Sequence, residues 1–153
     1  TFGFTGPCLT VDAACAGSLA AVHLARASLA ANECDVAIAA GVQLMLAPTA
    51  SQAIADLGLL SPDGVCREFD AAANGMVRGE GCSVVVLRRA DDADVTATHA
   101  VVAGSALTHK GRTEQVGAPS GDAVRRLYAA ALDSAGMEAH EVSYYEAHGG
   151  GTA

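Results

Sequence analysis

The pattern of apolar and polar positions divides the chain into helix-sized and strand-sized segments. Residues 15–31 are rich in Ala and Leu and contain no Pro, which gives strong helix propensity. Apolar residues cover nearly every face of this expected helix, as in a buried helix. Residues 36–40 are a continuous apolar run, and residues 82–87 are apolar apart from Ser83; both patterns are typical of strands covered on both faces in a parallel sheet. The pattern therefore predicts a sheet flanked by helices.

Shorter patterns predict the remaining elements. Residues 49–57 follow Pro48 and residues 122–135 precede Gly136, so both segments are expected to be helices with ordinary start and stop signals. Further strands are expected at three segments, residues 9–12, 100–107 and 142–145. The alternation of strands and helices predicts a layered α/β fold.

The composition adds an excess of apolar residues. The chain has 153 residues, enough for one domain, of which 51% are hydrophobic and 17% charged, and its mean hydropathy is +0.30. A soluble domain of this size needs a larger share of polar residues to cover its surface. The excess predicts an extensive oligomer interface, or a segment of a larger domain whose other parts cover its apolar faces.

Charge and cysteine usage exclude several classes of protein. The net charge of −8 disfavours nucleic acid as a partner. Five cysteines without a C-x-x-C pair or zinc spacing indicate reduced thiols and no metal site. The first residues do not form a signal peptide, and polar residues interrupt the longest apolar region. We therefore expect a cytoplasmic protein that does not enter a membrane.

Cys15 lies where a turn-sized break meets the first expected helix. The positive end of a helix dipole and free backbone N–H groups favour a thiolate and hold the oxyanion formed when it attacks a thioester. Ala14, Ala16 and Gly17 leave room for a substrate. The alternative is that Cys15 is a small buried residue, which is the usual role of a free cysteine. We assign that packing role to Cys8, Cys34, Cys66 and Cys82.

His148 lies between an apolar run and three consecutive glycines, where backbone can approach a ligand closely. Such a ring can act as an acid, a base or a hydrogen-bond donor. It can equally be a loop histidine followed by a flexible glycine tail. His23 is expected to be a satisfied core histidine, and the glycines match no nucleotide-binding motif, so no nucleotide cofactor is expected.

Four blocks of residues resemble the ketosynthase domains of type I polyketide synthases, in the thiolase-like superfamily of condensing enzymes. They cover the chain in order: GPCLTVDAACAGSL at 6–19, CDVAIAAGV at 34–42, SPDG to GMVRGEG at 61–81 and EAHGGGT at 146–152. The resemblance implies a thiolase-like layered α/β/α fold, of which residues 1–153 would form a partial domain, the middle portion. This portion runs from the nucleophile segment to the first catalytic-histidine loop.

The resemblance also implies an acyltransferase reaction. An acyl chain would pass from the phosphopantetheine of an acyl carrier protein to Cys15. A malonyl-type extender would then decarboxylate and attack that chain in a Claisen condensation. His148 would be one of two histidines that stabilise the enolate, and Thr152 would help to bind pantetheine. Family members are homodimers and bind neither a metal nor a cofactor directly, so an acyl carrier protein and a second copy are the implied partners.

The chain departs from the family pattern at three places. Ala13 replaces a Thr, Ala16-Gly17 replaces a Ser pair, and Gly150 replaces a Thr of the histidine loop. The family's second catalytic histidine, its lysine and a later glycine-rich loop lie beyond the EAHGTGT block. We therefore expect residues 1–153 alone to be inactive in condensation.

Three other interpretations remain open. The first is a ketosynthase of a fatty-acid or polyunsaturated-fatty-acid synthase, which would differ in starter and extender preference. The second is a non-catalytic partner subunit that sets chain length, although the presence of both Cys15 and His148 disfavours it. The third is a cysteine hydrolase, in which water rather than a carbanion would release the acyl group.

Overall fold

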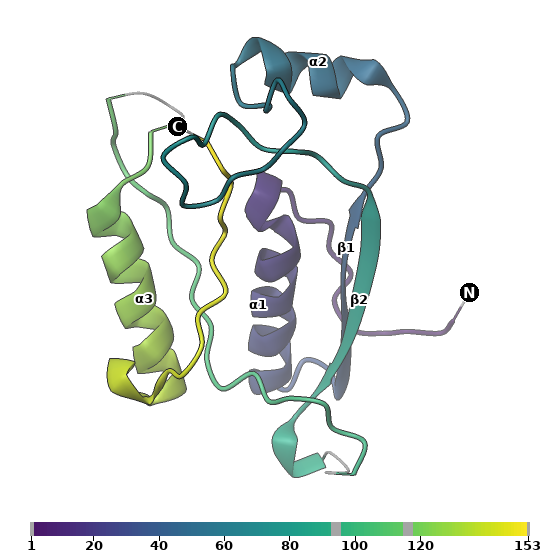
Figure 1. The fold of residues 1–153 in the computed structure, drawn as a ribbon. Coiled ribbons are helices and arrows are strands. Elements are labelled where there is room, and N and C mark those ends of the chain that lie inside the picture. The colour runs from purple at the N-terminus through teal and green to yellow at the C-terminus, as the bar shows by residue number, and fades with distance from the viewer. Residues whose placement is uncertain (1, 93–95, 115–117, 153) are drawn as a thin grey trace. The chain divides into compact units, whose positions relative to one another are not determined.

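The computed structural model describes residues 2–92, 96–114 and 118–152. Its helices are α1 (Gly17–Ala30), α2 (Pro48–Asp56) and α3 (Gly121–Ala135), and its strands are β1 (Val36–Gln43) and β2 (Gly81–Arg88), which pair in one sheet (Figure 1). Three short 3-10 turns complete the order: η1 (Ala14–Ala16), η2 (Ala90–Asp92) and η3 (Ala139–Glu141). The chain divides into two compact units, residues 1–41 with 84–143 and residues 42–83 with 144–153.

In the first unit, α1 packs against β1 at a glycine. A β-carbon built on Gly41 would lie 2.6 Å from the β-carbon of Ser18, so only glycine lets the first turn of α1 approach β1 this closely. Ala20 and Leu29 on α1 and Ala39 on β1 are buried. Two of these three buried side chains are alanines, so little space separates the helix from the strand.

The outward face of β1 is not covered by the described chain, contrary to expectation. Val36 and Ile38 are 47% and 54% exposed, whereas Ala39, which points to the opposite face, is 5% exposed. The continuous apolar run does form a strand, and this strand continues through Gly41 to Gln43. Only one of its two faces, however, is packed.

An extended segment runs between α1 and α3 in the same unit (Figure 1). Arg26 donates to the carbonyl of Ala103, the N–H of Ser105 donates to the hydroxyl of Ser134, and a β-carbon on Gly104 would clash with Ala135. Residues 100–107 were expected to be a strand, but side chains of the two helices take backbone bonds that a ladder would use. Residues 100–107 therefore form no strand in the structure.

The helix boundaries follow their sequence signals closely. Pro48 occupies the first turn of α2, where its missing N–H costs nothing. The Ser120 hydroxyl accepts a hydrogen bond from the N–H of Ala123 at the start of α3, and Gly136 ends this helix with φ of 64°. The expected strands at 9–12 and 142–145 are absent; the Val142 N–H instead closes η3 on Ala139.

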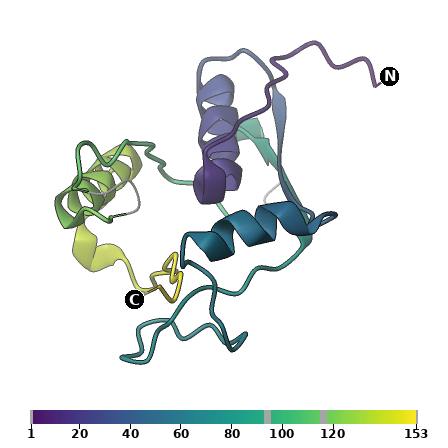
Figure 2. The ribbon, with the colours of Figure 1, turned by 90° about the horizontal axis from the view of Figure 1, so that it is seen from above.

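In the second unit, the C-terminal segment lies beside the loop that follows α2, as Figure 2 shows. The N–H of Gly75 donates to the carbonyl of Gly151 at 2.9 Å. Leu60 and Met76 form an isolated parallel bridge that closes the neck of this loop. The loop and the C-terminal segment thus form one packed body.

Candidate active site

Cys15 lies in η1, which leads directly into α1, and its side chain is exposed. The sequence predicted that the helix begins at this residue. The structure places the α-helix two residues later and gives Cys15 a tighter 3-10 turn. The thiol is therefore at the N-terminal end of a 14-residue helix and open to solvent.

The backbone before Cys15 is strained and held by local hydrogen bonds. Ala14 has a φ of 47°, a left-handed conformation that costs a non-glycine residue about 1–2 kcal/mol. Its N–H donates to the Asp12 carboxylate at 3.0 Å, and the N–H of Ala16 donates to the carbonyl of Ala13 at 3.0 Å. Strain of this kind is concentrated at functional sites. The hydrogen bonds to Asp12 and Ala13 hold the turn that presents Cys15. They bend the chain at the end of residues 9–12, which form no strand.

His148 belongs to the second unit, where its side chain is exposed. It lines a cavity of about 370 Å³ that also includes Glu68, Phe69 and the segment from Tyr144 to Gly149. Phe69 has a φ of 60° and is 88% exposed. The Tyr144 hydroxyl donates to Glu146 at 2.6 Å, which raises the pKa of Tyr144. The histidine therefore faces an open, partly acidic and aromatic hollow.

The three glycines after His148 are not an interchangeable flexible tail. Gly149 and Gly151 have φ of 51° and 64°, whereas Gly150 lies outside the left-handed region. A β-carbon on Gly151 would lie 2.9 Å from the sulfur of Cys66 and 3.0 Å from the carbonyl oxygen of Gly75. A β-carbon on Gly150 would lie 3.7 Å from Nε2 of His148, an ordinary contact. Gly151 is thus required by packing, while Gly150 leaves one side of the imidazole open.

We expect Gly151→Ala to destabilise the histidine loop by about 2 kcal/mol or more, because it combines left-handed strain with overpacking against Cys66. Gly150→Ala is the matched control and should change stability by less than about 0.5 kcal/mol. Midpoints of thermal unfolding in a complete ketosynthase that carries residues 1–153 would measure both. Equal midpoints for the two variants would contradict these separate roles of the glycines.

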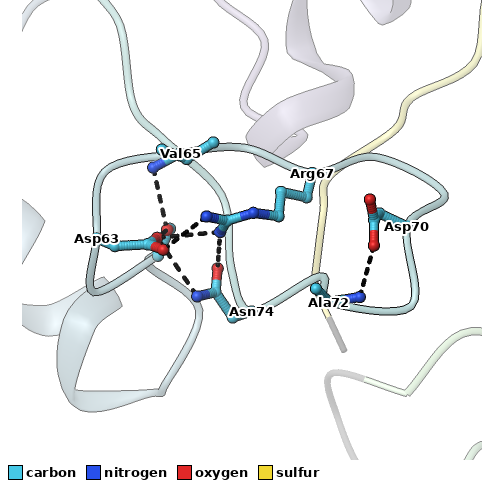
Figure 3. A network of polar contacts seen from close by, with 7 residues as sticks. Asp63, Val65, Arg67, Asp70, Ala72 and Asn74 are labelled. Atoms are coloured by element: carbon cyan, nitrogen blue, oxygen red, sulfur yellow. Dashed lines mark hydrogen bonds and ion pairs between the residues drawn. The ribbon is translucent and has the colours of Figure 1, made fainter.

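A polar network on the neighbouring loop was not predicted from the sequence. Asp63 accepts hydrogen bonds from both terminal guanidinium nitrogens of Arg67, at 2.8 and 3.2 Å, and also from the Ser61 hydroxyl at 2.6 Å and the Asn74 amide at 3.3 Å (Figure 3). The hydrogen bonds from Arg67 and Ser61 hold the pKa of Asp63 well below its usual range. The sequence signalled only the turn at residues 61–64. The residues that hydrogen bond to Asp63 lie up to 11 positions from it in the sequence and follow no period.

Cys66 has a structural environment. Its half-buried sulfur lies 3.9 Å from the carbonyl oxygen of Gly150, and a hydrogen bond to Glu68 together with burial raises the pKa of its thiol. The same hydrogen bond lowers the pKa of Glu68. The packing role expected for Cys66 fits these contacts.

The remaining candidates fall in different environments. Thr152 is exposed and follows buried Gly151. His23 shares a 2.9 Å hydrogen bond with the Ser105 hydroxyl, so its ring is satisfied as expected, but it is half-buried and does not belong to the buried core. Cys8 and Cys82 are exposed, so packing within the described chain does not account for them.

Comparisons with known proteins decide the family. The model of the beta-ketoacyl synthase N-terminal domain matches residues 1–93, and that of the C-terminal domain matches residues 99–153. The chain belongs to the β-ketoacyl synthase family. The predicted thiolase-like α/β fold and the ketosynthase resemblance are thereby confirmed.

Relatives of this ketosynthase chain are polyketide synthases. It is 50% identical to a phenolphthiocerol/phthiocerol polyketide synthase of Mycobacterium bovis, over 96% of the chain and 8% of that protein. It is 49% identical to polyketide synthase ThaG of Burkholderia thailandensis, over 99% of the chain and 3% of that protein. The chain thus spans a small part of the relatives it matches.

Solved ketosynthases have the same fold. The oxazolomycin ketosynthase domain from Streptomyces albus matches with a TM-score of 0.93 and 37% identity, over 99% of this chain and 27% of that one. The ketosynthase from module 6 of the Bacillus subtilis bacillaene synthase matches with a TM-score of 0.84 and 38% identity, over 90% of this chain and 25% of that one. Within the residues described, no helix could cross a membrane and no side-chain cluster could hold a metal.

Proposed function

We propose that residues 1–153 are part of a ketosynthase domain that elongates acyl chains in polyketide biosynthesis. The observation that carries the proposal is the match over almost the whole chain to solved ketosynthases, together with an exposed Cys15 where η1 meets α1. This part of the domain would run from the nucleophile segment to the first catalytic-histidine loop. Its substrates would be thioesters on the phosphopantetheine of an acyl carrier protein.

The reaction would proceed in two stages. The Cys15 thiolate attacks the acyl thioester carbonyl, the new carbon–sulfur bond forms, and the pantetheine thiolate leaves and takes up a proton. The carboxylate of a malonyl-type extender then leaves as CO₂, and its bonding electrons form an enolate. The enolate carbon attacks the acyl group on Cys15, a carbon–carbon bond forms, and the thiolate is released.

His148 would act in the second stage. As the extender loses CO₂, negative charge develops on its thioester oxygen, and a fixed N–H donor lowers the barrier to that step. An exposed imidazole on a loop beside an open cavity is accessible to such an extender. Thr152, two residues after Gly150, is the proposed contact for the pantetheine arm. A second copy of the domain is the proposed subunit partner.

The test is a product assay on a complete ketosynthase that carries residues 1–153. The enzyme is loaded with an acyl thioester and given a malonyl group on an acyl carrier protein, and mass spectrometry follows the acyl adduct and the chain. A β-ketoacyl product longer by two carbons supports the proposal. Release of the acyl chain as a free acid identifies a hydrolase, and absence of any adduct on Cys15 identifies a non-catalytic subunit; either result overturns the proposal.

A further inference from the structure

The loop of residues 61–76 is held in one shape by its own side chains. Its neck is closed by the N–H of Ser61 bonding to the carbonyl of Met76 at 2.9 Å and by the N–H of Met76 bonding to Leu59 at 2.8 Å. Its interior is cross-linked by the bidentate pair of Arg67 with Asp63. Such paired hydrogen bonds fix direction as well as distance. The loop of residues 61–76 therefore has a fixed shape, held by its own hydrogen bonds.

Asn74 joins the two sides of this loop. Its amide donates to Asp63 at 3.3 Å, and its carbonyl oxygen accepts from Arg67 at 3.4 Å, as Figure 3 shows. Arg67 is 29% exposed and Asp63 47%, so water competes with these bonds only in part. The cluster fixes the position of Gly75, which follows Asn74 directly. Gly75 itself is buried and has a φ of 140°.

The loop of residues 61–76 lies against each of the three residues that follow His148. Gly75 donates to the carbonyl of Gly151, and the sulfur of Cys66 approaches the carbonyl oxygen of Gly150. A β-carbon on Gly149 would lie 3.1 Å from the side chain of Glu68. The contacting residues flank the network on both sides, at 66, 68 and 75. The network therefore sets the backbone from which His148 projects.

We infer that Asp63 and Arg67 are positioning residues for His148 in the ketosynthase reaction. The inference rests on the proposed function, because it assigns these residues to the step that His148 would serve. They would influence decarboxylation of the extender and leave the acylation of Cys15 unaffected. Displacement of a catalytic group by about 1 Å lowers a rate by up to about 100-fold.

The test replaces Asp63 with Asn in a complete ketosynthase that carries residues 1–153. The Asn amide would present a donor to the Arg67 guanidinium, which is itself only a donor, so the bidentate pair would be lost. CO₂ release from a malonyl-loaded acyl carrier protein should fall about 10- to 100-fold in kcat with KM little changed. Acylation of Cys15, measured by intact mass, should stay within about twofold of the unsubstituted enzyme.

Asp122→Asn is the matched control, since it removes the carboxylate of an exposed ion pair with Arg125 on α3 and should change neither half-reaction. Arg67→Lys keeps a charge beside Asp63 but loses the second bond, and it should lower CO₂ release by less than Asp63→Asn does. This milder variant decides the matter if Asp63→Asn does not fold.

The outcomes separate the inference from the proposed function. Normal CO₂ release in both loop variants, with an inactive His148→Ala enzyme, overturns the inference and leaves the function standing. An equal loss of acylation and decarboxylation, with a lower midpoint of thermal unfolding, also overturns it, because the network would then serve only stability. Absence of CO₂ release from the unsubstituted enzyme overturns the proposed function and this inference together.

Discussion

Replacement of Cys15 by Ala is expected to abolish chain elongation, with a loss of about 10,000-fold or more, because no other group on the turn can form the acyl thioester. The exposed position of the thiol means that its removal leaves little unfilled space, so the midpoint of thermal unfolding should stay nearly constant. The measurement is elongation of a loaded acyl chain by a complete ketosynthase that carries residues 1–153. Intact mass should show no acyl adduct.

Two comparisons make this result specific. Cys8→Ala removes another exposed thiol a few residues earlier and should leave the adduct and the elongation rate unchanged. Decarboxylation of the malonyl extender should survive in Cys15→Ala, since in the proposed reaction that step depends on His148 and needs no acyl acceptor. An adduct that persists after Cys15→Ala would assign the nucleophile to another cysteine.

Strong local signals made most of the regular elements predictable. The Ala- and Leu-rich run gave α1, Pro48 and Gly136 marked the boundaries of α2 and α3, and largely apolar runs gave β1 and β2. These features act within a few residues along the chain. The elements that they predict therefore do not depend on residues far away in the sequence.

The three expected strands that are absent depended on a partner that the sequence could not specify. A strand is defined by the ladder it joins, and residues 100–107 instead bond to side chains of α1 and α3. The Asp12 carboxylate bonds to the N–H of Ala14 and turns the chain just after residues 9–12. Leu9, Val101 and Tyr144 of these segments are 69%, 70% and 78% exposed, so their side chains predicted neither pairing nor burial within the described chain.

The candidate residues of the site could be proposed from the sequence, whereas the contacts that support them could not. Cys15 and His148 could be named because each lies between a regular element or apolar run and a break of small residues. The Asp63 network could not, because its bonds join loop positions without any period. The strain at Ala14 and the different demands on Gly150 and Gly151 are likewise properties of backbone geometry, which residue types alone do not reveal.

His148→Ala is the second change with a large expected effect. Loss of one donor to a developing oxyanion lowers a rate by about 100- to 1,000-fold, or about 2.7–4 kcal/mol in the barrier. We expect that loss in CO₂ release from a malonyl-loaded carrier protein, measured on a complete ketosynthase that carries residues 1–153. Acylation of Cys15 should continue, because in the proposed reaction the His148 donor is needed only when the enolate forms.

The control for His148→Ala is His99→Ala, which removes another exposed imidazole outside the cavity and should alter neither half-reaction. His148→Gln distinguishes the two roles that an imidazole can play. A Gln amide retains an N–H donor but cannot exchange a proton, so recovery of part of the CO₂ release would support oxyanion stabilisation. If Gln were as inactive as Ala while both variants still acylate Cys15, proton transfer would replace hydrogen bonding as the role of this residue. That distinction matters for the neighbouring loop, because a hydrogen-bond donor must keep a fixed direction throughout the step. Asp63 and Arg67 are inferred to hold His148 in that direction.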